Sequence, residues 1–270
     1  MSSEPIALQL PGSDFSLRLY VHGEQDQFVS RRIRQEGVWE PYESSLVLSL
    51  LQPGDVFVDV GANIGYFCVL AAAIVGEAGA VFAFEPDSDN CDLLRRSAAL
   101  NDMDSIITVV EAGLSDTSGE AQLFLSENNL GDHQIYATDD ARPSTPISLY
   151  HGSDYLRGRL QRIDLLKVDT QGSEYQVMAG LLPLLQELAR VPRMIIELTP
   201  YSLRQAGASG RALIELLATL GEPLSIIDHI EHRVVLSSTE DLALWCDNVD
   251  RTEGDQGFMN ILVGSTPSGL

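Results

Sequence analysis

From Val56 onward, short apolar runs alternate with longer segments in which apolar side chains recur at helical spacing. The apolar runs have the length of buried strands, and they are Val56–Val60, Ala80–Phe84, Ile106–Glu111, Ile163–Val168 and Met194–Leu198. The other segments have the period of amphipathic helices, and they are Ile64–Val75, Asp87–Asn101, Glu174–Ala189 and Gly210–Leu220. This alternation predicts an α/β fold with a mostly parallel sheet and helices on both faces.

The C-terminal strands depart from the alternation. Leu224–Ile230 and Arg233–Leu236 are followed by Phe258–Val263, and we expect no helix between them long enough for a parallel crossover. Antiparallel strands need only a short turn. We therefore expect an antiparallel hairpin at one edge of the sheet.

The domain organisation follows from these patterns. Ile6–Leu10 and Phe15–Val21 alternate apolar and polar side chains, which predicts a hairpin in an N-terminal extension. The segment after Ser115 is irregular, with strand-like pieces at Ala121–Leu125 and Thr145–Leu149. We expect an extension at 1–40, a main domain at 41–265 with an insert at about 117–160, and a tail at 266–270.

Charge and cysteine content exclude several classes of function. The chain carries 39 acidic and 17 basic side chains, a net charge of −22. Such a field repels phosphate backbones and anionic lipids, so we expect neither a nucleic-acid nor a membrane partner. The three cysteines lie far apart without metal-ligand spacing, which favours a reducing, cytoplasmic location. Nothing in the sequence decides the oligomeric state, and a homodimer stays open.

The first apolar strand runs into a glycine-rich turn. Asp59 lies near its end, and Gly61 and Gly65 follow before the helix. Glycines allow a tight turn and the close approach of a ligand to the backbone. The spacing is Gly-x-x-x-Gly rather than Gly-x-Gly-x-x-Gly, and the charge of Asp59 would oppose a pyrophosphate. A carboxylate here suits a cationic ligand, such as the α-amino group of a methionine moiety.

The next two strand ends support a nucleoside site. Glu85 follows the second strand, where a carboxylate can accept hydrogen bonds from both ribose hydroxyls. The third strand leads into Gly113, whose neighbours are small and suited to border an adenine. Three such features at successive strand ends indicate a nucleoside-containing cofactor.

The sequence resembles the FkbM family of S-adenosylmethionine-dependent methyltransferases. The residues that carry the resemblance form five blocks over roughly residues 40–200, and they are Val58–Phe67, Phe84–Pro86, Gly113–Asp116 with Gly119, Ile163–Glu174 with Gly180, and Ile195–Leu198. The pattern Lys-x-Asp-x-x-Gly-x-Glu, from Lys167 to Glu174, is the most distinctive block and is intact. The resemblance implies a Rossmann-like methyltransferase fold with a seven-stranded sheet.

The resemblance also implies S-adenosyl-L-methionine as cofactor and S-adenosyl-L-homocysteine as product. Asp59, Gly61, Gly65 and Glu85 match cofactor positions of the family. The full set of residues predicted to bind the cofactor comes from the same strand ends, and it is Asp59, Gly61, Ala62, Asn63, Gly65, Phe67, Glu85, Pro86, Asp87, Gly113, Leu114, Ser115 and Asp169. The family usually methylates oxygen, so we expect a small-molecule acceptor, or one derived from a glycan or peptide.

Methyl transfer to a hydroxyl requires positioning and help in removing the proton. Candidates should lie beyond the carboxyl ends of the fourth and fifth strands or in the insert. We predict His133 or Asp169 as the base, with Gln171 and Glu197 shaping the acceptor site. Lys167, two residues before Asp169 on the same face of its strand, can pair with a carboxylate.

Several alternatives stay open. Asp132, Asp139, Asp140 and Asp169 offer oxygen ligands for Mg²⁺, but no spacing rule demands a metal and none is expected. Aromatic side chains at Trp39, Tyr42 and Tyr66 serve core packing or an acceptor pocket. A nicotinamide-dependent oxidoreductase on a related sheet, or a non-catalytic adenosyl-binding module, are the competing functions.

Overall fold

The computed structural model describes residues 4–10, 12, 15–137 and 142–266. The helices are α1 (Val29–Glu36), α2 (Pro41–Leu50), α3 (Tyr66–Val75), α4 (Ser88–Leu100), α5 (Gly152–Leu156), α6 (Glu174–Glu187), α7 (Pro200–Gln205), α8 (Gly210–Ala218) and α9 (Thr239–Arg251). The strands are β1 (Ile6–Ala7), β2 (Arg18–Leu19), β3 (Val56–Val60), β4 (Ala80–Phe84), β5 (Ile107–Val110), β6 (Gly113–Ser115), β7 (Gly119–Phe124), β8 (Ser144–His151), β9 (Leu165–Val168), β10 (Arg193–Leu198), β11 (Leu224–Asp228), β12 (Arg233–Ser237) and β13 (Met259–Val263). The expected tail lies outside the described residues from position 267 onward.

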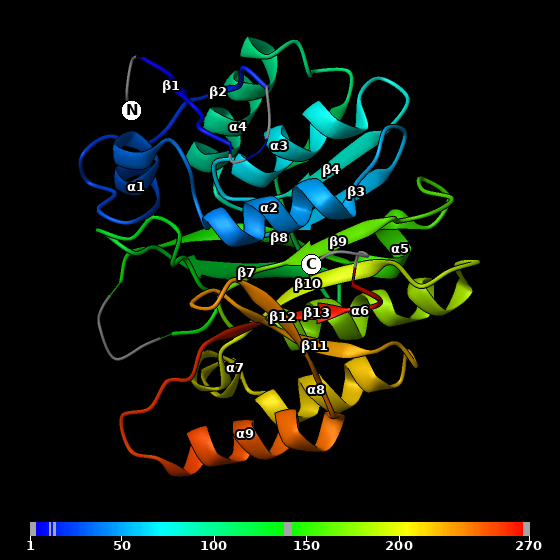
Figure 1. Cartoon of the computed structure of the whole chain (residues 1–270). Coiled ribbons are helices and arrows are strands. Elements are labelled where there is room, and N and C mark those ends of the chain that lie inside the picture. The colour runs from blue at the N-terminus through cyan, green and yellow to red at the C-terminus, as the bar shows by residue number, and fades with distance from the viewer. Residues whose placement is uncertain (1–3, 11, 13–14, 138–141, 267–270) are drawn as a thin grey trace.

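The central sheet has eight strands in the order β12-β11-β13-β10-β9-β3-β4-β5 (Figure 1). Neighbouring strands from β10 to β5 are parallel, whereas β13 is antiparallel to both β10 and β11. At one edge, β11 and β12 form an antiparallel hairpin. The predicted Rossmann-like α/β fold with an edge hairpin is therefore confirmed. The sheet has eight strands instead of seven because β12 adds a strand beyond β11.

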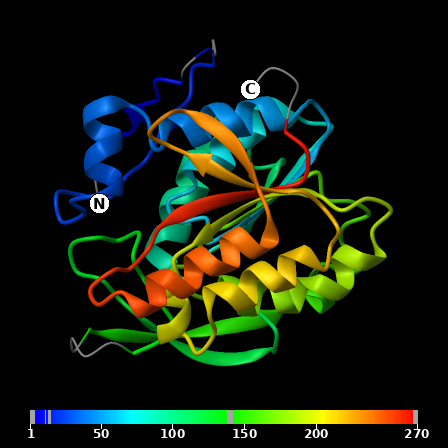
Figure 2. The same cartoon turned by 60° about the horizontal axis from the view of Figure 1, so that its bottom comes forward.

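Helices cover both faces of this sheet, because successive side chains of a buried strand point to opposite sides. Phe57 belongs to the apolar core beneath α2, α3 and α4, whereas its neighbour Val58 belongs to the core beneath α6, α8 and α9. Both side chains are fully buried. Figure 1 shows the two helix layers above and below the sheet, and the turned view of Figure 2 brings α8 and α9 forward.

The N-terminal segment packs onto the α3 side of the sheet. Ile6 pairs with Leu19 between the short antiparallel strands β1 and β2, as the hairpin prediction requires. Leu19 and Val21 are fully buried in the same core as α3 and α4. Helix α1 was not expected from the sequence, and it buries Ile33 in that core. The N-terminal segment thus contributes to the main core.

The expectation of no long helix between the last strands was wrong. Helix α9 lies between β12 and β13, begins at Ser238, whose hydroxyl accepts the Asp241 N–H, and packs against α8. Its buried face consists of Leu242, Ala243, Cys246 and Val249, and acidic side chains precede and follow this set along the helix. Because the segment is rich in acidic residues, the helical spacing of its buried side chains was not recognised from the sequence. Strand β13 lies between β10 and β11, and it is antiparallel to both of them.

The insert forms a second sheet of its own. Strands β6, β8 and β7 lie in that order, with β8 parallel to β6 and antiparallel to β7. Its apolar residues Leu123 and Ile147 are buried. The strand-like piece expected at Ala121–Leu125 overlaps the C-terminal part of β7 and runs one residue beyond it, and the piece expected at Thr145–Leu149 lies within β8.

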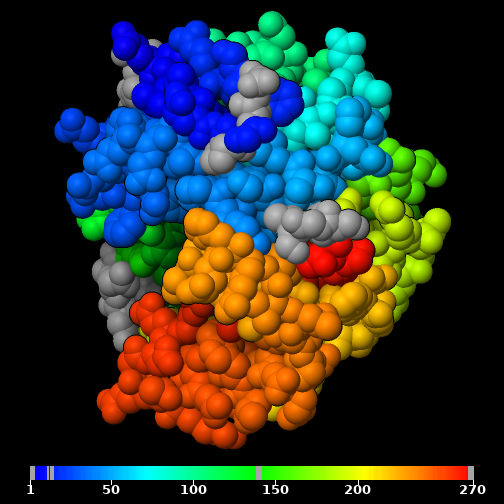
Figure 3. Space-filling model, in the orientation of Figure 1, coloured from blue at the N-terminus to red at the C-terminus, as the bar shows by residue number. Residues whose placement is uncertain are grey.

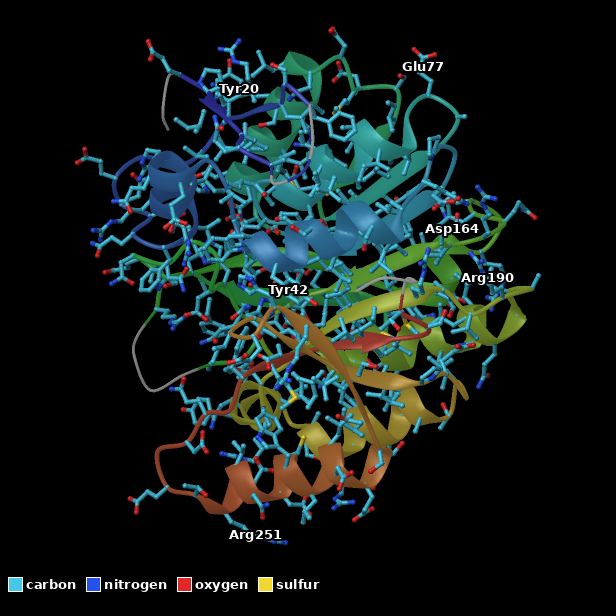
Figure 4. All side chains as sticks on the ribbon, in the orientation of Figure 1. Tyr20, Tyr42, Glu77, Asp164, Arg190 and Arg251 are labelled. Carbon is cyan, nitrogen blue, oxygen red and sulfur yellow. The ribbon has the colours of Figure 1, made fainter. Side chains whose placement is uncertain are left out.

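The order of the parallel strands reverses between β3 and β9. The chain runs outward from β3 through β4 to β5, and then returns to place β9 on the other side of β3. Ligands of open α/β sheets bind beyond the carboxyl ends of the strands at such a reversal. Figure 4 places Asp164 and Arg190, joined by an ion pair of 2.9 Å, at the opposite, amino-terminal end of β9.

Candidate active site

A row of polar side chains crosses the middle of the sheet on the face that α2 and α3 cover. Asp59 of β3 lies in register with Lys167 of β9, and Glu197 of β10 lies in register with Asn260 of β13. All four side chains are buried. Parallel strands bring their carboxyl ends to one edge, so residues far apart in the chain meet there. The row ends at the reversal of strand order, where two clefts open.

The turn after β3 forms the wall between these clefts. Gly61 has φ +86°, and a Cβ at this position would lie 1.8 Å from the backbone oxygen of Asp169. Its N–H donates to the Phe84 carbonyl. Only glycine combines this left-handed backbone with such a close approach. The turn is therefore pressed between the ends of β4 and β9.

The first cleft, which we call the β4-side cleft, lies beyond β4 and below the insert sheet. Its space outside protein atoms is about 600 Å³, including the open mouth. It is lined by Val60, Gly61, Asn63, Phe84, Glu85, Pro86, Asn90, Gly113, Leu114, Leu123, Leu130, Gly131, His133, Ile135, Ile147, Leu149, Asp169, Thr170, Gln171 and Ser173. The insert supplies an apolar roof, and the loop residue Leu130 accepts a hydrogen bond from the Asn63 side chain at 3.4 Å.

Glu85 is the carboxylate of the β4-side cleft. One of its oxygens accepts the Asn63 N–H at 2.7 Å, and the other accepts the Asp87 N–H at 2.9 Å. Burial raises the pKa of Glu85 to about 7, although these backbone donors oppose the shift. The side chain is held in one orientation by the main chain and presents a hydrogen-bond acceptor to the cleft.

His133 lies in the wall of the β4-side cleft and does not line the second cleft. Its Nδ1 accepts the Ser126 N–H at 3.0 Å. Burial lowers the pKa of the imidazole, despite the nearby Asp87 carboxylate. His133 is thus neutral near pH 7.

The second cleft, which we call the β10-side cleft, opens on the α2 face of the sheet. It encloses about 1310 Å³ outside protein atoms, again including its mouth. It is lined by Phe28, Val29, Trp39, Glu40, Asp59, Gly61, Ala62, Asn63, Ile64, Tyr66, Phe67, Asn129, Gly131, Asp132, Lys167, Asp169, Gln171, Glu197, Thr199, Ser202, Gln256, Gly257 and Phe258. The residues that line both clefts are Gly61, Asn63, Gly131, Asp169 and Gln171.

Lys167 is the cation of the β10-side cleft. Its Nζ lies 2.9 Å from Asp169 Oδ2, 3.6 Å from Glu43 Oε1 and 4.7 Å from the centre of the Phe67 ring. Burial alone would lower the pKa of Lys167, but the surrounding carboxylates outweigh burial and hold the pKa well above its usual value. The ammonium stays charged because it lies among acids.

Glu43 connects this cluster to the C-terminal part of the chain. The side chain is fully buried, and Oε2 accepts a hydrogen bond from Asn260 at 2.6 Å. Its neighbour Tyr42 stacks on His232, with the ring centres 5.3 Å apart. Figures 3 and 4 show this contact region, with α2 beside the β11–β12 hairpin and Tyr42 at the boundary.

The loop after β9 orients the junction of the two clefts. Gln171, at φ +55°, donates from Nε2 to Asp169 at 2.8 Å and to Glu197 at 3.0 Å. The fully buried Glu174 accepts hydrogen bonds from the Thr170 and Gly172 N–H groups. The Lys-x-Asp-x-x-Gly-x-Glu spacing from Lys167 to Glu174 thus has a physical basis: the lysine pairs with Asp169, and the glutamate accepts hydrogen bonds that hold the loop.

Asp169 and Glu197 differ in their tendency to hold a proton. Burial would raise the pKa of Asp169, but Lys167 outweighs burial and lowers it. Burial and the nearby Asp169 raise the pKa of Glu197 well above its usual value. A proton is therefore held more readily by Glu197 than by Asp169.

The predicted cofactor residues divide between the clefts. Those in the wall of the β4-side cleft are Gly61, Asn63, Glu85, Pro86, Gly113, Leu114 and Asp169. Asp59, Ala62 and Phe67 instead line the β10-side cleft. Gly65, Asp87 and Ser115 line neither: Gly65 packs on Leu94, Asp87 caps α4, and the Ser115 hydroxyl bonds Asp116. Of the aromatic candidates, Trp39 and Tyr66 line the β10-side cleft, whereas Tyr42 does not.

Sequence reasoning missed two acids of α2 and its N-terminus. Glu40, at φ +43°, lines the β10-side cleft, and Glu43 pairs with Lys167. The available signal was the acid Glu43 in a segment whose apolar side chains recur at helical spacing. Within the described residues, no three histidine, cysteine or acidic side chains gather as a metal site, and Asp139 and Asp140 lie outside that part of the chain.

Comparison with known proteins identifies the family. Residues 59–224, more than half of the chain, match the family described as the methyltransferase FkbM domain. The chain therefore belongs to the FkbM methyltransferase family.

Two curated relatives share part of this region. Methyltransferase sdnD of Sordaria araneosa is 33% identical over 153 residues, which cover 46% of this chain and 59% of that protein. Hexuronic acid methyltransferase AglP of Haloferax volcanii is 29% identical over 145 residues, which cover 53% of this chain and 56% of that protein. The matches thus span a little over half of each relative.

A solved structure of methyltransferase FkbM from Methylobacillus flagellatus KT is also similar. It has 16% sequence identity and a TM-score of 0.45, and the match covers 79% of this chain and 44% of that chain. No described helix has the length and apolar character needed to cross a membrane.

Proposed function

We propose that the chain is an S-adenosylmethionine-dependent methyltransferase that methylates a hydroxyl oxygen of a small molecule. The observation that carries the proposal is the junction of two clefts at the reversal of strand order, with Gly61, Asp169 and Gln171 in both walls. Direct group transfer needs a donor and an acceptor in contact with no water between them. Membership of a methyltransferase family supports methyl as the group transferred.

The β4-side cleft fits the proposed cofactor. Glu85 presents a carboxylate for ribose hydroxyls, while Leu114 and Leu149 offer apolar walls for a planar base. The turn at Gly61 packs against the Asp169 backbone and forms the wall that the two clefts share. Asn63 and Gly113 complete the residues proposed to hold the nucleoside. When bound, S-adenosylmethionine supplies a methyl group on a positively charged sulfur.

The chain's own residues would position the acceptor at the junction. We propose Asp169, which Lys167 keeps ionised, as the group that accepts the hydroxyl proton. Gln171 holds the Asp169 and Glu197 carboxyl groups together, so that Glu197 shapes the acceptor side of the junction. His133 is placed less well for this task, because it lines only the β4-side cleft.

The acceptor class is part of the proposal. We propose a natural product, a sugar or a peptide-derived molecule, in line with the family resemblance; the name of the Haloferax volcanii relative, hexuronic acid methyltransferase, supports a sugar. The described cysteines are buried and unpaired, which supports the proposed cytoplasmic location. Since the chain belongs to a methyltransferase family, a nicotinamide-dependent oxidoreductase is not proposed.

Calorimetric titration of the full chain tests the donor side. We expect S-adenosylmethionine and S-adenosylhomocysteine to bind and NAD not to bind. Glu85→Gln should weaken S-adenosylhomocysteine binding about 30-fold, because a hydrogen bond to a charged group contributes roughly 2 kcal/mol. A matched control is Glu120→Gln, an exposed acid of β7, which should bind like the native chain. NAD binding without adenosyl binding would sink the proposal, and binding without methyl transfer would leave a non-catalytic module.

A further inference from the structure

The acids in the wall of the β10-side cleft exceed its cations. Glu40, Asp59, Asp132, Asp169 and Glu197 line it together with Lys167. Asp132 is paired with Arg142 at 3.0 Å. The Lys167 ammonium is shared between Asp169 and Glu43, the latter behind the cleft wall. Of the remaining acids, Glu197 accepts hydrogen bonds from Gln171 and Thr199, whereas Glu40 and Asp59 form no ion pair with a cation of the described residues.

Both of these acids have a buried oxygen with an unfilled hydrogen-bonding capacity. Asp59 is 1% exposed and lines the cleft; its Oδ2 accepts from the Cys68 thiol, but Oδ1 has no hydrogen-bond partner within the described chain. Glu40 also lines the cleft, and its Oε2 is likewise buried without such a partner there. A buried carboxylate oxygen left unpaired is costly. A ligand that donates hydrogen bonds and carries positive charge would satisfy both.

The mouth of the same cleft is aromatic. Phe28 and Phe258 are 52% and 57% exposed and line it from opposite ends of the chain, and Trp39 stands beside Glu40. Aromatic faces attract ammonium groups and pack against rings and aliphatic carbon. Buried acids inside the cleft, with exposed aromatic side chains around its opening, are the arrangement expected of a binding site for an organic cation. A small metal ion would gain nothing from the aromatic side chains.

We propose that the β10-side cleft recognises an acceptor that carries a protonated amine in addition to the hydroxyl to be methylated, with Glu40 and Asp59 binding the ammonium group. This inference rests on the proposed function, because it assigns the acceptor of the same transfer. It predicts that a neutral or anionic acceptor of the same shape binds more weakly. The excess of 22 negative charges on the whole chain favours the approach of a cation as well.

The ammonium group of the cofactor itself is the competing occupant. Asp59 adjoins the junction, and the sequence pattern alone assigned its carboxylate to the methionine moiety. Glu40 separates the two cases, because it lines only the β10-side cleft. A loss confined to the acceptor on Glu40→Gln supports the proposal, whereas an equal loss of cofactor affinity assigns the cation to the cofactor.

The test uses three phenols that differ only in the group at the end of one side chain: tyramine, tyrosol and 4-hydroxyphenylacetate. Each is titrated calorimetrically into the full chain saturated with S-adenosylhomocysteine at neutral pH. We expect tyramine to bind at least about tenfold more tightly than tyrosol, and 4-hydroxyphenylacetate most weakly. Equal or tighter binding of either other phenol, or no binding of tyramine at millimolar concentration, overturns the proposal.

Variants then assign the cation to its residues. Glu40→Gln should remove the tyramine preference, about a tenfold loss, while tyrosol and S-adenosylhomocysteine bind as before. Glu120→Gln deletes one exposed acid that lines neither cleft and should keep the preference. If Glu40→Gln does not fold, the same three phenols are titrated into Asp59→Asn, which should also lose the preference for tyramine. Failure of S-adenosylhomocysteine to bind the native chain would refute the proposed function, whereas binding without charge preference refutes only this inference.

Discussion

The two clefts meet at one glycine turn and yet depend on different parts of the molecule. In the β4-side cleft, Glu85 is oriented by the backbone N–H groups of Asp87, two residues later, and of Asn63, in the turn after the neighbouring strand β3. In the β10-side cleft, Lys167 holds carboxylates that come from α2 and from the end of its own strand. The first cleft is therefore a property of main-chain geometry, and the second is a property of charge balance among distant residues. Mutations should separate the two.

The largest effect should follow from Gly61→Ala, which affects both clefts. The new Cβ would approach the Asp169 backbone oxygen in a left-handed conformation that disfavours alanine. We expect the free energy of unfolding to fall by about 3 kcal/mol or more, with loss of S-adenosylhomocysteine binding. Gly207→Ala is the control, since Gly207 has φ +83° with no atom within 4 Å, and should cost only about 1–2 kcal/mol. Native-like binding by Gly61→Ala would show that the turn can move.

Lys167→Met should disrupt the β10-side cleft alone. It leaves Glu43 and Asp169 buried without their cation, and breaking a buried pair in this way costs about 3–5 kcal/mol. The loss should be largest at pH 8 and shrink toward pH 5, because the acids can then take up protons. Chemical denaturation at both pH values measures this. A loss independent of pH would point to packing on Phe67 instead.

Asp59→Asn should change stability in the opposite direction. Burial raises the pKa of Asp59 to about 6. An acid whose pKa is raised by folding contributes stability below its unfolded pKa, and that contribution disappears as the pH rises through the folded value. The variant should therefore be more stable than the native chain by about 1–3 kcal/mol at pH 8 and equally stable near pH 4. Denaturation curves at the two pH values measure the free energy of unfolding. A variant less stable than the native chain at pH 8 would mean that the Asp59 carboxylate stabilises the Lys167 ammonium.

His133→Ala should give the smallest effect and sharpen the division between the clefts. Because His133 lines only the β4-side cleft, we expect S-adenosylhomocysteine to bind about threefold to tenfold more weakly, with little change in turnover. Calorimetry and methyl-transfer assays with radiolabelled S-adenosylmethionine measure the two quantities. A drop in turnover of about a hundredfold at unchanged affinity would restore His133 as the base.

Much of the β4-side cleft was accessible from sequence, because its signals are local. Gly61 and Glu85 follow apolar strands, and the alternation of elements already places successive strand ends at one edge. Helix α9 was missed because acidic side chains surround its buried face. The position of the insert over the β4-side cleft was not predicted either. The sequence around Leu123 and Ile147 shows that these strands have an apolar face, but not which surface that face covers.

The sequence by itself determined the α/β fold, the edge hairpin, the family and the carboxylates and glycines at the strand ends. These depend on periodicity and spacing over a few tens of residues, which the chain carries locally. Only the tertiary structure decided that Glu40 and Glu43 face Lys167, more than a hundred residues later in the chain, and that Asp59 lines the β10-side cleft. The physical reason is that buried charges are stabilised by whichever partners the fold brings within a few ångströms, and that set of neighbours is a property of packing.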